Sequence, residues 1–143
     1  MPVNPKRAVL LAFLSLTACV TPTGVATPIE LSPTATSLKG WISTRGEWTL
    51  FPTARFGTYS PYRVTEAQKC VSLVNDTGEP RASYASLQAH RVRVIGFVRG
   101  YDELANAEDP AERLLSKKYY KKELVENSCL REFVFIVQRV EPL

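Results

Sequence analysis

The sequence predicts a mainly β domain, a small barrel of five strands with one helix after the third strand. Segments rich in β-branched and aromatic residues, several with alternating apolar and polar positions, recur along residues 38–143. Turn-forming residues separate these segments. One segment alone, starting at Asp109, carries the signals of a helix start. A small α+β sheet or a β-sandwich fits the same pattern and stays the alternative.

The first β segment covers residues 41–51, where Ile42, Trp48 and Leu50 share one side of the alternation. Arg45-Gly46 in its middle is compatible with a single strand or a tight hairpin. Pro52 ends the segment, and a loop rich in aromatic residues follows. The second β segment covers residues 70–74 and is closed by turn residues at 75–78. Residues 83–87 form a short helix or a loop.

The third β segment, residues 91–100, has valines at alternate positions that predict a core face. Its other face gathers arginines and Phe97. A bulge at Gly96 would reverse the direction of Phe97 and turn that side chain inward. The last segment, residues 132–141, is apolar on both faces over residues 133–137, which predicts a central or barrel-closing strand.

Asp109 is the predicted N-cap and Pro110 the first helical residue. Glu112, three residues after Asp109, is placed to complete a capping box. Leu114 and Leu115 are expected to form the buried side of this helix. Four lysines and two tyrosines follow at 117–122, and we expect a solvated helix end there, where the helix dipole favours cations. Binding of an anionic polymer or of lipid headgroups is the alternative.

These segments resemble the strands of an OB-fold barrel. The resemblance rests on Gly40-Trp41 and on residues 70–74, 92–96 and 133–140, and it covers most of residues 38–143. It implies a ligand face on the second and third strands that binds oligonucleotides, oligosaccharides or protein segments. Because this is an analogy at the level of the fold, it assigns no ligand residue.

The N-terminus has the three-part layout of a secretory signal peptide over residues 1–18. Lys6 and Arg7 precede an apolar run at 8–16 that is too short to span a bilayer, and small residues follow. Leu16-Thr17-Ala18-Cys19 resembles the lipobox of bacterial lipoproteins. The resemblance implies cleavage before Cys19 and acylation of that cysteine, which would tie the chain to a membrane. Ordinary secretion is the alternative.

The residue after Cys19 is valine and not aspartate, which by resemblance to enteric lipoproteins favours the outer membrane over the inner one. Residues 19–37 contain three prolines and little apolar mass, and they predict a flexible tether. A structured arm packed on the domain is the alternative. Residues 38–143 then suit one globular β domain with one core.

The formal net charge is +4, and removal of Lys6 and Arg7 lowers it to +2. So small a charge argues against nucleic acid as a partner. With Cys19 acylated, Cys70 and Cys129 remain and predict a disulfide in an oxidising compartment. Zinc is the alternative, but the spacing lacks a CxxC pair or a nearby histidine. No metal and no cofactor is expected.

The predicted ligand face combines aromatic and basic residues, and its alternative is a row of solvated arginines beside a buried phenylalanine. It consists of Trp41, Tyr59, Arg91, Arg93, Phe97 and Arg99. His90, the one histidine, is expected at the surface. The acidic residues Glu47, Asp76 and Glu79 stand in no recognisable catalytic motif.

We therefore expect no enzyme but a membrane-anchored periplasmic lipoprotein, a binding module for an envelope protein or for cell-wall glycan (peptidoglycan). A structural or assembly component of an envelope complex is the alternative. A cleft that holds a carboxylate of raised pKa would instead favour an enzyme.

Overall fold

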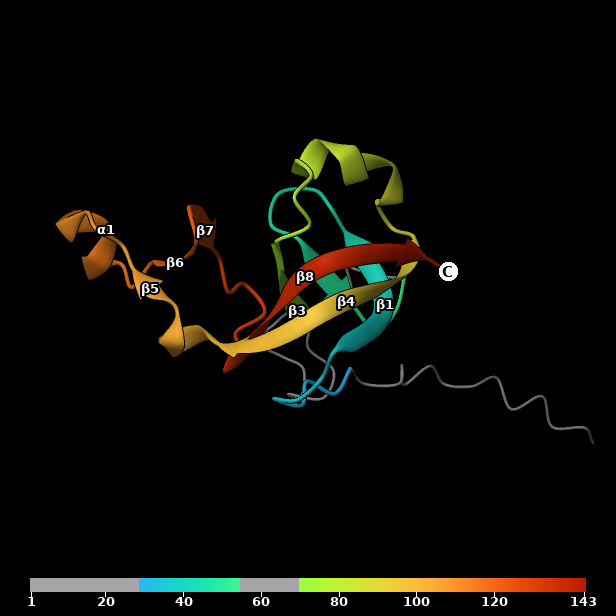
Figure 1. Cartoon of the computed structure of the whole chain (residues 1–143), viewed down its shortest axis with the longest axis horizontal. Coiled ribbons are helices and arrows are strands. Elements are labelled where there is room, and N and C mark those ends of the chain that lie inside the picture. Colours follow the sequence, from blue (N-terminus) through green and yellow to red (C-terminus); the bar gives the residue numbers. More distant parts are fainter. Residues whose placement is uncertain (1–28, 55–69) are drawn as a thin grey trace, which may run out of the picture.

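The computed structural model describes residues 29–54 and 70–143. Five strands close into a barrel in the order β1-β2-β3-β8-β4, with β4 paired to β1 (Figure 1). Neighbouring strands are antiparallel except β3 and β8, which run parallel. The mainly β, OB-fold-like barrel predicted from the sequence is confirmed. The strands are β1 Ser37–Ser43, β2 Thr49–Phe51, β3 Val71–Asn75, β4 Arg91–Gly100 and β8 Phe133–Pro142.

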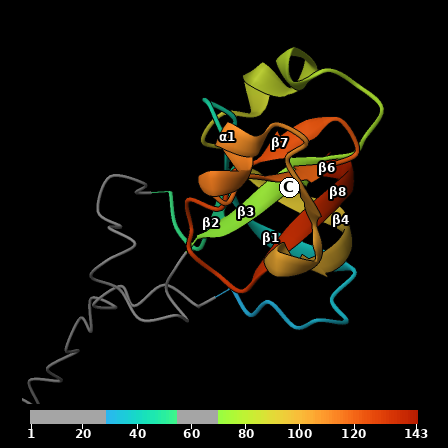
Figure 2. The same ribbon diagram turned by 90° about the vertical axis from the view of Figure 1, so that its left-hand side faces the viewer.

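The helix after the third barrel strand is the 3-10 helix η3, Arg81–Leu87, which lies over one end of the barrel (Figure 1). The helix predicted from Asp109 belongs to a later insertion between β4 and β8, which projects to one side of the barrel (Figures 1 and 2). Its strands form a separate antiparallel sheet in the order β5-β6-β7. The insertion contains η4 Tyr101–Glu103, β5 Ala105–Asn106, α1 Pro110–Leu114, β6 Lys118–Tyr120 and β7 Glu123–Val125.

Of the two alternatives predicted for residues 41–51, a single strand or a hairpin, the structure shows the hairpin. β1 and β2 pair in the register Ile42↔Leu50. Ile42, Trp48 and Leu50 are fully buried in the barrel, as their shared face in the alternation predicts. The ring of Tyr84 in η3 packs edge-on against Trp48, with 5.1 Å between the ring centroids. This contact ties the 3-10 helix to the core.

The packed domain extends further toward the N-terminus than the predicted boundary at residue 38. Ile29 is only 6% exposed and belongs to the barrel core, and Leu31 and Ala35 pack against that core. Gly40 packs closely on both β2 and this arm, since a Cβ at that position would lie 2.7 Å from the Phe51 carbonyl oxygen and 3.1 Å from Ile29 Cδ1. The last part of the predicted tether is therefore a structured arm on the barrel.

The bulge predicted at Gly96 lies in the partner strand. Ile95 pairs with Arg139 and Gly96 with Val137, so the extra residue is Gln138 of β8. Gly96 is still required, because a Cβ there would lie 1.8 Å from the carbonyl oxygen of Ile136. The alternation of β4 is therefore not reversed at Gly96.

Phe97 consequently keeps its outward direction, and the insertion covers it. A second apolar cluster forms between the outer face of the barrel and the insertion. Phe97 packs against this cluster, with its ring 6.5 Å from that of Tyr120. Residues Val134–Val137 of β8 are all fully buried, because β8 contributes to both clusters. The central, barrel-closing role predicted for this strand is confirmed.

Helix α1 begins at the predicted residues, with Asp109 Oδ1 accepting a hydrogen bond from the Ala111 amide at 2.8 Å. The Glu112 carboxylate, predicted to complete a capping box, instead accepts a hydrogen bond from the Tyr119 hydroxyl at 2.8 Å. The predicted buried side is wrong: Leu114 and Leu115 are 87% and 69% exposed. The lysine segment is not helical either. Residues 118–120 form β6, and a turn at Lys121 leads directly into β7.

A disulfide joins Cys70 to Cys129, as the sequence predicts, and connects the start of β3 to the segment before β8. The two Cα atoms are 5.3 Å apart and the cysteines are 59 positions apart in sequence. The bond points to an oxidising, extracytoplasmic compartment. Within the described ranges, no helix has the length and apolar character needed to cross a membrane.

Candidate functional site

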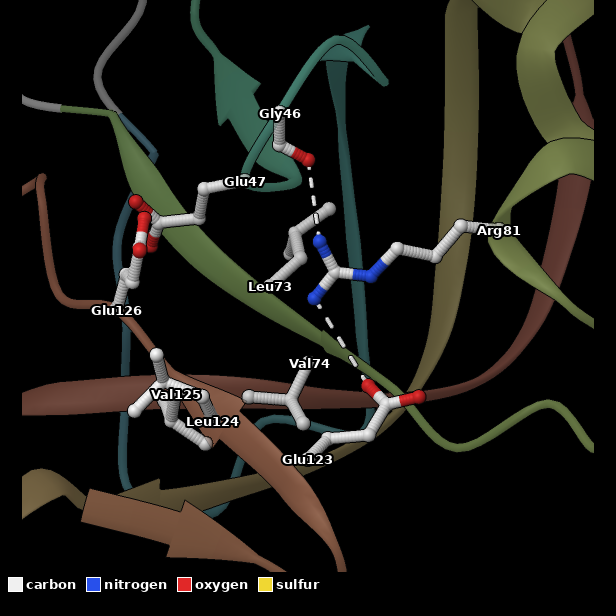
Figure 3. A pocket seen from close by; sticks show the side chains of 9 residues that line it. All are labelled: Gly46, Glu47, Leu73, Val74, Arg81, Glu123, Leu124, Val125 and Glu126. Atoms are coloured by element: carbon white, nitrogen blue, oxygen red, sulfur yellow. Dashed lines mark hydrogen bonds and ion pairs between the residues drawn. The ribbon is translucent and has the colours of Figure 1, made fainter.

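A cleft of about 440 Å³ lies where the β1–β2 loop, β3, the start of η3 and strand β7 meet (Figure 3). Its volume falls in the range of small-ligand sites, about 300–1,000 Å³. It combines an apolar surface with charged groups at two ends. The lining residues are Gly46, Glu47, Leu73, Val74, Arg81, Glu123, Leu124, Val125 and Glu126.

The barrel itself positions the apolar part of the cleft. Strand β2 is three residues long and pairs with β3 only at Val71 and Ser72. The next residues of β3, Leu73 and Val74, line the cleft beyond that pairing. Val74 packs with Val125 of β7 in the second apolar cluster. The insertion therefore forms one wall of the cleft and shares a core with its floor.

Arg81 bridges one end of the cleft. Its Nη1 donates a hydrogen bond to the Gly46 carbonyl at 3.0 Å, and its Nη2 lies 3.8 Å from Glu123 Oε2 (Figure 3). The side chains of Arg81 and Glu123 are 38% and 44% exposed. An ion pair so exposed contributes little to stability, about 0–1 kcal/mol. Its effect is geometric: it joins the β1–β2 loop to the insertion through η3.

Glu47 and Glu126 line the other end of the cleft (Figure 3). Both carboxylate oxygens of Glu47 are buried, and neither has a hydrogen-bond partner of good geometry. Burial raises the pKa of Glu47, and the charge of Glu126 adds to that rise. The nearby Ser72 and Ser128 lower the pKa in part. This end of the cleft is therefore acidic, and the hydrogen-bonding capacity of the Glu47 carboxylate is only partly satisfied.

The same negative charge reaches Tyr101 at the start of the insertion. Burial raises the pKa of the Tyr101 hydroxyl, and Glu47, Asp102 and Glu126 raise it further. Three acidic residues from separate segments of the chain thus act on one tyrosine. The acidic character is a property of the region and not of one side chain.

The ligand face predicted from the sequence lies elsewhere, around β1 and β4. Trp41 and Arg91 are paired across these strands and both line a hollow of about 650 Å³, together with Lys39 and Glu30. Arg93 Nη1 lies 3.5 Å from Glu141 Oε2. The structure therefore brings Trp41 and Arg91 together and pairs Arg93 with a carboxylate.

The remaining predicted residues do not join that hollow. The guanidinium of Arg99 lies 5.4 Å from the ring centroid of Phe97, a cation–π contact. Tyr59 and Cys19 lie outside the described residues. His90 is exposed, with its Nδ1 3.0 Å from the Gln88 carbonyl oxygen, as expected for a surface histidine.

The sequence reasoning missed Glu47 as a site residue. Glu47 follows Arg45-Gly46 in a turn and has no motif around it. Its environment is made by Ser72 and by Glu126 and Ser128, all remote in sequence. A buried carboxylate of raised pKa beside a second carboxylate is able to transfer a proton or to hold a cation. Within residues 29–54 and 70–143, no group of three or more potential metal ligands is present.

Comparisons with protein-family models, with curated proteins and with solved structures find no match to the chain. The function is therefore argued from the cleft, the disulfide and the sequence of the N-terminus.

Proposed function

We propose that the protein is a binding module of the bacterial cell envelope, anchored through Cys19 and taking an envelope protein or cell-wall glycan into the cleft. The position of the cleft carries this proposal. OB-fold barrels bind ligands on the face of strands 2 and 3 and with the loops that follow strands 1 and 4. The cleft is lined by β3, by the β1–β2 loop and by the insertion after β4, which are the corresponding parts of this barrel.

Two features support a location of the protein in the cell envelope. The Leu16-Thr17-Ala18-Cys19 segment ends a signal-like leader, and acyl chains on Cys19 would give stable membrane attachment. The Cys70–Cys129 disulfide fits an oxidising compartment such as the periplasm. Attachment to a membrane would raise the effective concentration of the cleft near any ligand held in the same envelope.

The binding function is tested by site-specific photo-crosslinking in intact cells, with the photoreactive residue at Leu124 in the cleft. The matched control carries it at Leu114, an exposed leucine on α1 outside the cleft. We expect a discrete crosslinked species from position 124 and none from position 114. No product at position 124, or the same products at both positions, would contradict the proposal.

The anchor is tested by mass spectrometry of the mature N-terminus. We expect the chain to begin at Cys19 and to carry the mass of attached acyl chains. An unmodified terminus, or cleavage at another position, would rule out the lipoprotein assignment while leaving the cleft unaffected.

An enzyme acting on cell-wall glycan is the second candidate, and the raised pKa of Glu47 beside Glu126 favours it. Paired carboxylates of unequal pKa are the acid and base of glycoside hydrolysis. The assay is release of reducing ends from purified peptidoglycan by the wild-type chain and by Glu47→Gln. Release that disappears in the variant would establish the enzyme, and binding without release would favour the module.

A further inference from the structure

The outer face of strands β1, β4 and β8 gathers cationic side chains around a tryptophan. Val92 and Val94 of β4 are fully buried, so the residues that alternate with them point outward. Residues directly opposite each other in paired strands lie on the same face, so the outward residues of β1 and β8 join those of β4. We call this surface the basic face. It consists of Lys39, Trp41, Arg91, Arg93, Arg139 and Glu141.

Cationic side chains outnumber carboxylates on the basic face. Glu141 is shared by two arginines, with its carboxylate 3.5 Å from Arg93 Nη1 and 2.9 Å from Arg139 Nη2. Within residues 29–54 and 70–143, neither Lys39 nor Arg91 forms an ion pair. Both of these residues are exposed. The basic face therefore attracts an anionic surface.

The basic face lies where the chain runs toward Cys19. Ile29 and Glu30 line the hollow that Trp41 and Arg91 share. With Glu30 counted, four cationic side chains still meet only two carboxylates. Ile29 is packed in the barrel core ten positions after Cys19, so a chain of at most roughly 35 Å joins this face to that cysteine. An acylated Cys19 would therefore hold the basic face near a bilayer.

We propose that the basic face rests on the anionic phospholipid headgroups of the membrane that holds Cys19. Lys39 and Arg91 would donate hydrogen bonds to the lipid phosphates. The partly exposed indole of Trp41 would lie at the level of the headgroups, where aromatic rings are enriched. Basic residues close to a bilayer are attracted to anionic lipid in this way. The inference rests on the anchor in the proposed function and adds a second contact with the same membrane.

This contact would leave the cleft open. The cleft is lined by β3, the β1–β2 loop, the start of η3 and residues 123–126, and it shares no residue with the basic face. A barrel held both by its tether and by this face would not turn freely on the lipid. A cell-wall glycan also carries carboxylates, but the tether brings lipid and not glycan to the basic face.

The test is quenching of tryptophan fluorescence by brominated phosphatidylcholine, with the full acylated chain reconstituted in vesicles. The chain contains two tryptophans, and Trp48 is fully buried in the barrel, so contact quenching reports on Trp41. At equal bromine content, we expect about twofold or stronger quenching in vesicles that contain phosphatidylglycerol than in vesicles without it. Trp41→Phe should remove this difference. Equal quenching in the two kinds of vesicle, or a difference that persists in Trp41→Phe, would overturn the inference.

Matched charge reversals identify the face. Arg91→Glu, and independently Lys39→Glu, should reduce the quenching to the level measured without phosphatidylglycerol, because each turns an exposed cation of the basic face into an anion. Lys122→Glu, the same change at an exposed lysine of the insertion, should leave the quenching unchanged. The emission maximum of buried Trp48, measured with Trp41→Phe in each background, reports that the barrel is folded. Loss of the difference in all three variants, or in none of them, would contradict the role of the basic face.

The anchor and the basic face fail in different ways. Mass spectrometry of the same preparation shows whether Cys19 is acylated. An acylated chain without lipid-dependent quenching would reject the basic face and keep the anchor, whereas an unmodified chain would reject both. Soluble peptidoglycan fragments that shield Trp41 from acrylamide more strongly than phosphatidylglycerol vesicles do would assign the face to glycan and overturn the lipid contact.

Discussion

At Gly96 the backbones of β4 and β8 approach so closely that a side chain has no room. A Cβ would lie 1.8 Å from the Ile136 carbonyl oxygen, which is held in the barrel and cannot move aside cheaply. We expect Gly96→Ala to lower the free energy of unfolding by about 3 kcal/mol or more, measured by urea denaturation. Gly100→Ala is the control, because its nearest contact is the flexible Glu103 side chain, and a cost equal to that of Gly96→Ala would refute the explanation.

The buried carboxylate of Glu47 should make stability depend on pH. Its pKa is raised in the folded protein, so between about pH 4.5 and that raised pKa the folded state binds more protons than the unfolded state. The free energy of unfolding attributable to Glu47 should therefore fall as pH rises through this window. Glu126 and Tyr101 face the same region, so the informative quantity is the difference between wild type and a variant.

The variant is Glu47→Gln, followed by denaturant unfolding from pH 4.5 to pH 8. We expect the variant to gain stability relative to wild type as pH rises through this window and to keep that gain at higher pH. A difference that stays constant across this pH range would show that the Glu47 carboxylate is not destabilised by burial.

For individual residues, predictions from the sequence are confirmed where the local chemistry of a residue decides its interactions. Asp109 caps α1, and Cys70 and Cys129 pair. The burial of Glu47 was not predicted, because the residues around its carboxylate come from β3 and from the end of the insertion. A carboxylate in a turn carries no local signal of burial, because the burying residues arrive from other parts of the chain.

At the scale of elements, helix α1 is exposed on every residue except half-buried Glu112. Leu114→Ser should therefore change the free energy of unfolding by no more than about 0.5 kcal/mol. Leu104→Ala, at a residue packed in the second apolar cluster, should cost about 2–3 kcal/mol in the same thermal or urea experiment. Equal costs for the two variants would mean that α1 packs against the barrel in solution.

The lysine segment shows why the element prediction failed there. Tyr120 donates a hydrogen bond to Asp76 Oδ2 at 3.0 Å, and Lys121 Nζ lies 2.6 Å from Asp76 Oδ1. Asp76 follows the end of β3, so these contacts hold residues 120–121 against the barrel in a turn between β6 and β7. Local helix propensity is a weak preference that such tertiary contacts override.

On the scale of the whole molecule, the disulfide closes a long loop between β3 and the segment before β8. Replacing both Cys70 and Cys129 by alanine should lower the free energy of unfolding by about 4 kcal/mol on the chain-entropy account. Denaturant unfolding of the double variant and of the reduced wild type should give similar losses. A loss below about 1 kcal/mol in both would show that the packed barrel alone fixes these segments.

The barrel as a whole was predictable because each of its strands carries an apolar face or an apolar run of its own. The insertion and the cleft were not, since β5, β6 and β7 are two or three residues long and carry no recognisable period. Their position depends on Val125 and Leu104 packing on the outer face of β8 and β3. Pairings of this kind become visible only when the tertiary structure is known.

Ile29, buried in the barrel, also limits how far the molecule can reach. Ile29 lies ten positions after Cys19, and an extended chain of that length spans at most roughly 35 Å. In Figure 1 the segment that starts at Ile29 (blue) lies below the barrel, η3 lies above it, and β7, which also borders the cleft, lies to its left. With Cys19 in a bilayer, this length would keep the barrel close to the lipid surface, and its cleft could meet only ligands that lie near that surface.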